Sequence, residues 1–158
     1  MNDLVNSLQN AIRTGNAAFV ANVIKDYPHL INKADERGFT PLIMAAYFNH
    51  LEIVEILVDN GANLNDVDGL GNTALMGAVF KGYPEVVEYL LEKGASVEVK
   101  NFNGANVMTY AASFGTAEII EMLVEAKADA TVKDSKGLTP IDYARKQGNK
   151  TFLDAIGA

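Results

Sequence analysis

DGLGNTAL, at residues 68–75, is one of four segments that align without gaps. The others are DERGFTPL at 35–42, NFNGANVM at 101–108 and DSKGLTPI at 134–141. Their glycines, Gly38, Gly71, Gly104 and Gly137, are each 33 residues apart. An apolar run recurs with the same period, as IVEILV at 53–58, VVEYLL at 86–91 and IIEMLV at 119–124. A fixed period of this length indicates an array of stacked units rather than one compact globule.

The residue types within each unit predict two helices joined to the next unit by a turn. Glycine accepts the positive φ that a tight turn requires. The position after each turn holds a good helix N-cap, and proline can follow at the first helical position; the caps are Thr40, Thr73, Asn106 and Thr139. The second half has the spacing of an apolar helix face. One unit cannot bury that face alone, so neighbouring units must bury it jointly, as in a solenoid.

The pattern resembles the ankyrin repeat, with its D-x-x-G-x-T-P-L turn, I-V-x-x-L-L helix and following Gly-Ala pair, such as Gly61-Ala62 and Gly94-Ala95. The resemblance covers essentially the whole chain and is closest to small, free-standing, bacterial-type ankyrin repeat proteins. It implies an all-α repeat solenoid of stacked helix–turn–helix repeats joined by β-turn or hairpin loops. We expect a single domain, 1–158, with capping repeats at 1–34 and 134–158 and full repeats at 35–67, 68–100 and 101–133.

The composition of the 158 residues excludes several classes of site. There is no cysteine and there are only two histidines, which rules out cysteine-ligated metals and histidine-rich sites. The net charge is −7, from 13 basic and 20 acidic residues. Binding to nucleic acid or to an anionic membrane requires clustered positive charge, so we expect neither. We expect no cofactor, no metal and, without a signal peptide, a cytoplasmic location.

The sequence motifs also argue against catalysis. Residues 69–74, GLGNTA, fit a dinucleotide-binding pattern, but they lie on the repeat turn without the preceding buried strand. No nucleophile–base pair is evident. The carboxylates recur every 33 residues, as in Glu52, Glu85 and Glu118, which is typical of a solvated outer face. We therefore expect a protein that is not an enzyme.

The resemblance places partner binding on the concave face, which is formed by the turn tips and the ends of the first helices. Most of these helix-end positions in the complete repeats are aromatic. Aromatic side chains beside cations are the usual anchors of protein interfaces. The predicted partner-binding residues are Arg37, Phe39, Tyr47, Phe48, Leu70, Phe80, Lys81, Phe102 and Phe114.

Several alternatives remain open at this point. Some of the rings, Phe80 and Phe114 above all, can instead pack inward between repeats, and Arg37 and Lys81 can simply be solvated. The leading hypothesis is a non-enzymatic protein–protein interaction module that holds one protein partner, as a monomer. The alternatives are an inhibitor or immunity-type protein that blocks a co-expressed enzyme, and a self-associating structural protein.

Overall fold

The computed structural model describes residues 2–158, which form ten α-helices, one short 3-10 helix and no strands. The α-helices come in five consecutive pairs. These are α1 (Asn2–Thr14) with α2 (Ala17–Asp26), α3 (Pro41–Tyr47) with α4 (Leu51–Asp59), α5 (Ala74–Lys81) with α6 (Pro84–Glu92), α7 (Val107–Phe114) with α8 (Ala117–Glu125), and α9 (Pro140–Gln147) with α10 (Lys150–Ile156). The 3-10 helix η1 (Pro28–Leu30) follows α2.

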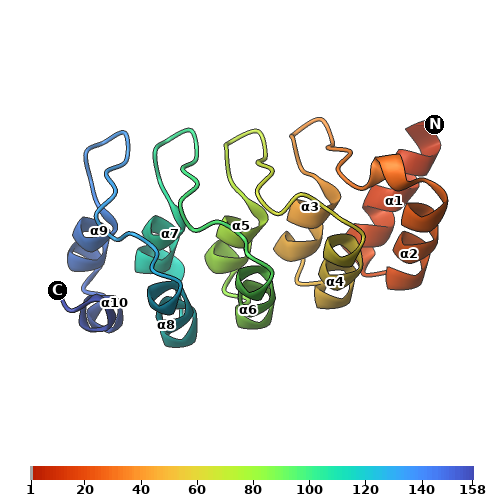
Figure 1. The fold of residues 1–158 in the computed structure, drawn as a ribbon. Coiled ribbons are helices and arrows are strands. Elements are labelled where there is room, and N and C mark those ends of the chain that lie inside the picture. Colours follow the sequence, from red (N-terminus) through yellow and green to blue (C-terminus); the bar gives the residue numbers. More distant parts are fainter. Residues whose placement is uncertain (1) are drawn as a thin grey trace.

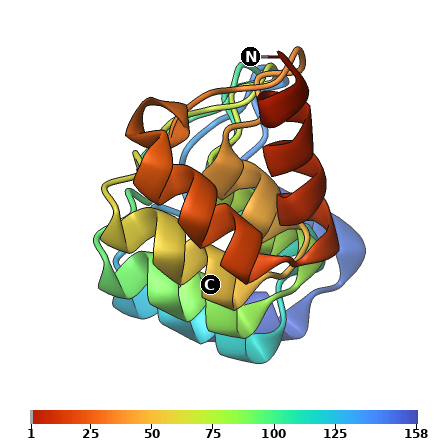
Figure 2. The ribbon, with the colours of Figure 1, turned by 90° about the vertical axis from the view of Figure 1, so that its right-hand side faces the viewer.

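The pairs lie side by side in one row, with the N-terminus at one end and the C-terminus at the other (Figure 1). The first helices pack on one another as one layer, α1 on α3, then α5, α7 and α9. The second helices form the other layer, from α2 to α10. Viewed along the row, the pairs overlap and the loops project at one side (Figure 2). The predicted all-α repeat solenoid is therefore confirmed.

The first helices of the last four pairs begin at the predicted N-caps. In each, the cap side chain accepts a hydrogen bond from the backbone N–H three residues on, as Thr40 does from Ile43 at 3.3 Å and Asn106 from Thr109 at 3.2 Å. Because these caps satisfy backbone donors that have no partner within the helix, they define where each helix starts.

The projecting loops are held by a repeated hydrogen-bond pattern. At the base of each loop, one side-chain oxygen accepts bonds from the backbone N–H groups two and four residues on; the residues are Asp35, Asp68, Asn101 and Asp134. Neighbouring loops are also joined by backbone bonds, such as Gly69 N–H to the Arg37 carbonyl at 2.8 Å and Phe102 N–H to the Leu70 carbonyl at 3.1 Å. The loops therefore form a continuous row rather than independent arms.

The core runs along the whole row between the two helix layers. It consists of the apolar faces predicted from the repeated runs, with Ile53, Leu57, Leu90 and Leu123 fully buried. The periodic acidic residues of the second helices point away from this core, and Glu52, Glu85 and Glu118 are all exposed. An even distribution of this kind is typical of a solvated outer face and does not imply a binding site.

A histidine ties the first two helix pairs together. Nε2 of His50 lies 3.1 Å from the backbone carbonyl of Arg13, so this nitrogen donates the hydrogen bond. Asn149 makes a related tie between the last two pairs, since its amide donates to the Ala112 carbonyl at 2.8 Å. A structural role accounts for His50 in full.

The turn after α8 carries a strained residue that suggests a stabilising substitution. Lys127 has a φ of +60°, where the equivalent Gly61 and Gly94 have +89° and +90°. A left-handed conformation costs a side-chain-bearing residue about 1–2 kcal/mol, part of which is offset by the greater unfolded-state entropy of glycine. We expect Lys127→Gly to raise the free energy of unfolding by about 0.5–1 kcal/mol in urea denaturation. Lys133→Gly, at an exposed position without positive φ, is the control and should not stabilise.

Candidate functional site

The predicted partner-binding residues lie on the loops and on the ends of the first helices. Five of the apolar ones are markedly exposed: Phe102 at 73%, Leu70 at 66%, Phe114 at 54%, Phe80 at 40% and Phe48 at 39%. Phe39 and Tyr47 are half-buried, and Arg37 and Lys81 are exposed. We call these nine residues together with Tyr110 the aromatic surface. Exposed apolar side chains gathered on one side of a protein mark an interaction site.

Around α3, three rings and two cations form one cluster. The ring of Tyr47 packs edge-on against both Phe39, at 6.1 Å between centroids, and Phe48, at 5.6 Å. The guanidinium of Arg37 lies 5.0 Å from the Phe39 centroid, and Nζ of Lys81 lies 5.0 Å from that of Tyr47. These cation–π contacts show that the two cations lie against the rings and are not merely solvated.

A second cluster joins α5 to α7. Phe80 packs edge-on against Phe114 at 4.9 Å and against Tyr110 at 6.0 Å. The sequence left open whether these two phenylalanines pack between repeats or lie exposed. Both hold in part, because the rings contact each other across two repeats while each remains at least 40% exposed. Such mutual packing holds the rings in one orientation, which reduces the conformational entropy lost on binding.

The loop tips add two apolar side chains. Leu70 and Phe102 occupy adjacent tips, and the backbone bond between these residues sets the spacing of the two loops. An ideal Cβ on Gly71 would lie 2.8 Å from the Phe102 ring and 2.7 Å from its backbone nitrogen, so the absence of a side chain at Gly71 allows the loops to approach.

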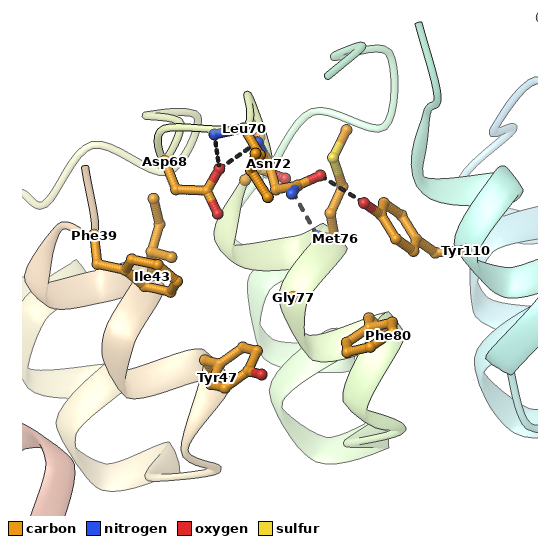
Figure 3. A pocket seen from close by; sticks show the side chains of 11 residues that line it. Phe39, Ile43, Tyr47, Asp68, Leu70, Asn72, Met76, Gly77, Phe80 and Tyr110 are labelled. Carbon is orange, nitrogen blue, oxygen red and sulfur yellow. Dashed lines mark hydrogen bonds between the residues drawn. The ribbon is translucent and has the colours of Figure 1, made fainter. Parts of the chain in front are cut away.

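Between the clusters lies a pocket of about 260 Å³ that we call the Gly77 pocket (Figure 3). Its walls come from α3, α5 and α7 and from the loop before α5. It is lined by Phe39, Ile43, Tyr47, Asp68, Leu70, Asn72, Thr73, Met76, Gly77, Phe80 and Tyr110. Four of the lining residues outside the predicted set matter most to its shape and polarity, namely Asp68, Asn72, Gly77 and Tyr110.

A sequence signal for this pocket does exist. Glycine in the middle of a helix is unfavourable relative to alanine, so Gly77 within the helix 74–81 indicates close approach or free space. Position 77 corresponds to Met44, Tyr110 and Tyr143 in the other repeats. The pocket therefore lies where three other repeats carry a large side chain.

Tyr110 shows how a tyrosine at this repeat position is held. Its hydroxyl donates to Oδ1 of Asn72 at 2.8 Å (Figure 3). The same hydroxyl accepts a hydrogen bond from the amide of Asn101 at 3.2 Å. Burial raises the pKa of the Tyr110 hydroxyl above its ordinary value. The hydroxyl therefore stays protonated at neutral pH and continues to act as a donor.

Neither a metal-binding cluster nor a membrane-spanning helix is found among the described residues. Within residues 2–158, no three His, Cys, Asp or Glu side chains are grouped so that they could hold a metal ion. In the same part of the chain, no helix is both long and apolar enough to cross a bilayer.

The repeat geometry agrees with comparisons to known proteins. A family model described as ankyrin repeats (3 copies) matches residues 8–101, and a second, described as ankyrin repeats (many copies), matches residues 96–144. The chain belongs to the ankyrin repeat family. Ankyrin repeats indicate a protein–protein interaction module, and such modules are generally without catalytic activity of their own.

Two known proteins each resemble a short stretch of this ankyrin repeat protein. It is 60% identical over 35 residues to the DNA-binding protein RFXANK of Mus musculus, covering 22% of this chain and 13% of that protein. The match to DNA-binding protein RFXANK of Homo sapiens is 54% over 35 residues, covering 22% and 14%. The matched stretch is thus a small part of either relative and is about one repeat long.

Proposed function

We propose that this ankyrin repeat protein binds one protein partner through the aromatic surface, as a non-enzymatic module. The observation that carries the proposal is that five of the predicted partner-binding residues are large apolar side chains that are exposed. Exposed apolar residues are unremarkable singly, but here Phe48 and Phe80 lie in pre-packed ring clusters. Rigid aromatic anchors beside cations are the residues that contribute most to binding energy at interfaces.

The charge of the surface supports a protein partner that is not strongly basic. Arg37 and Lys81 are the cations in contact with the rings, whereas the acidic residues of the second helices lie on the other layer. Each cation provides a polar rim to an apolar centre, which is the usual arrangement of an interface. We further propose that the protein acts in the cytoplasm as a monomer. The alternatives are an inhibitor or immunity-type protein that blocks a co-expressed enzyme, and a self-associating structural protein.

Substitution of both Phe48 and Phe114 by alanine is expected to weaken partner binding at least about tenfold, because each is an exposed anchor of a different ring cluster. Peptides selected from a random display library provide a defined ligand, and calorimetry provides the affinity. The melting temperature should change little, since surface substitutions usually alter stability by less than about 0.5 kcal/mol.

Tyr27→Ala is the matched control, because this exposed tyrosine follows α2 and lies outside the aromatic surface. It should leave the affinity unchanged. An equal loss of affinity in the control, or a large loss of stability in the double variant without a loss of binding, contradicts the proposal. Light scattering over a range of protein concentrations, with and without peptide, separates self-association from binding of a different protein.

A further inference from the structure

The Gly77 pocket differs from the equivalent space in the other repeats by one missing side chain. Tyr110 and Tyr143 occupy the same repeat position in the next two units. Each hydroxyl is hydrogen-bonded to the residue at the base of its own loop, nine positions earlier: that of Tyr110 accepts from Asn101, and that of Tyr143 donates to Asp134. In the repeat with Gly77, that base residue is Asp68, and no tyrosine of the repeat reaches it.

The hydrogen bonds of the four residues at the loop bases, Asp35, Asp68, Asn101 and Asp134, also set the repeat with Gly77 apart. In all four, one side-chain oxygen holds the loop backbone. In three of them, the other terminal atom of the carboxylate or amide also has a polar partner. In Asp35 it faces Arg37 at 3.9 Å, in Asn101 it donates to Asn72 and Tyr110, and in Asp134 it accepts from Tyr143.

Asp68 is the exception. It is only 8% exposed, yet within residues 2–158 its Oδ2 accepts no hydrogen bond, while Oδ1 accepts from Leu70 and Asn72. No fully buried polar side-chain atom in this part of the chain lacks a partner, so Oδ2 must reach solvent. Asp68 lines the pocket, and Figure 3 shows its second oxygen turned away from the loop. A carboxylate oxygen that has no hydrogen-bond partner within the protein is a strong acceptor for any donor that enters the pocket.

The remaining walls suit an aromatic ring. Phe39, Ile43, Tyr47 and Met76 are apolar, and the pocket of about 260 Å³ is smaller than the ~300–1,000 Å³ typical of sites for drug-sized ligands. There is room at its floor, since an ideal Cβ on Gly77 would meet only Tyr47, at 3.9 Å. A single ring with a donor at its far end therefore matches both the apolar walls and Asp68.

We propose that the Gly77 pocket receives a tyrosine side chain of the protein partner, whose hydroxyl donates a hydrogen bond to Oδ2 of Asp68. The inserted ring takes the place that Tyr110 and Tyr143 fill within their own repeats. This inference rests on the proposed function, since it names the residue that the partner contributes to the aromatic surface. It makes a phenol hydroxyl, and not only an apolar ring, part of what is recognised.

The test uses p-cresol, which is the tyrosine side chain without its backbone. Its comparison compound is 4-methylanisole, in which a methyl group replaces the hydroxyl proton. In titrations followed by NMR, p-cresol should shift the amides of residues 68–80 and bind at least about tenfold more tightly than 4-methylanisole, because a hydrogen bond to a charged group is lost in the latter. Equal affinities, or shifts elsewhere in the chain, would overturn the assignment.

Asp68→Asn provides a second, chemical check. The remaining oxygen can still hold the loop, as Asn101 does, while the amide turned to the pocket can only donate. The ligand oxygen must then accept, and 4-methylanisole can accept as p-cresol can. The preference for p-cresol should therefore disappear in this variant, and its persistence would show that Asp68 does not receive the hydroxyl.

Gly77→Tyr supplies the missing ring from the chain itself and should abolish p-cresol binding without lowering the melting temperature. Gly77→Met, which copies Met44, should also block the pocket and serves if the tyrosine variant fails to fold. Retained p-cresol binding in a folded variant at this position overturns the proposal.

Selected peptides separate this inference from the proposed function. We expect them to contain a tyrosine whose replacement by phenylalanine weakens binding at least about tenfold, and to lose affinity for Gly77→Tyr. Peptides that depend on Phe48 and Phe114 but bind Gly77→Tyr normally would uphold the proposed function and overturn the tyrosine pocket. If no selected peptide depends on Phe48 and Phe114, the proposed function fails, and the partner tyrosine with it.

Discussion

Leu90→Ala is expected to lower the free energy of unfolding by about 2–5 kcal/mol. Leu90 lies on α6, is fully buried, and belongs to the continuous core between the two helix layers. The substitution removes buried apolar surface and leaves a cavity that the surrounding structure cannot fully close, because interiors are packed at the density of organic crystals. The helix that carries it, α6, packs against α4, α5 and α8.

Leu70→Ala is the matched control for this prediction. The same atoms are removed, but Leu70 is 66% exposed at a loop tip, where substitutions usually change stability by less than about 0.5 kcal/mol. Urea denaturation followed by circular dichroism measures both. Similar losses in the two variants would mean that Leu90 is not the core residue that its burial indicates.

Gly71→Ala is expected to lower the free energy of unfolding by about 3 kcal/mol or more, for two separable reasons. Gly71 has a φ of +83°, a conformation that costs a residue with a Cβ on the order of 1–2 kcal/mol. The added Cβ would also lie 2.7 Å from the backbone nitrogen of Phe102, which donates to Leu70. Backbone cannot move aside as a flexible side chain can, so the loop row must open at this point.

Gly61→Ala isolates the first reason from the second. Gly61 has a similar φ of +89°, but nothing lies within 4 Å of its ideal Cβ. Its cost should therefore be only the backbone strain, about 1–2 kcal/mol. If Gly61→Ala proves as destabilising as Gly71→Ala in parallel denaturation curves, the close approach of the loops contributes nothing, and the expected excess is wrong. Because Leu70 and Phe102 occupy these loops, Gly71→Ala should also weaken peptide binding.

Much of the fold follows from local residue chemistry. The caps Thr40 and Asn106 start their helices because they satisfy backbone donors nearby in the chain, which a sequence pattern can reveal. The strain at Lys127 is likewise visible as the replacement of the glycine found at the same position in two other repeats. Helix capping and backbone strain of this kind depend on residues close by in the chain, so they can be recognised without the tertiary structure.

The candidate site is only partly predictable. The repeat register identifies Phe48 and Phe102 as side chains of the turn tips and first-helix ends, and they are exposed. It does not decide whether Phe80 packs or points outward, since that depends on Phe114 and Tyr110 from the next repeat. Cross-repeat packing is a property of side-chain volume and orientation, which a period of 33 residues does not specify.

The sequence by itself determined the units, their helices and their order, because one period repeats the same capping, turn and apolar positions. Only the tertiary structure decided what the differences between units mean. Gly77 is a weak helix residue in the sequence, but in space it leaves Oδ2 of Asp68 without the tyrosine that satisfies the equivalent atom of Asp134. The physical reason is that a pocket consists of the volume left between neighbouring repeats, and no single repeat contains that volume.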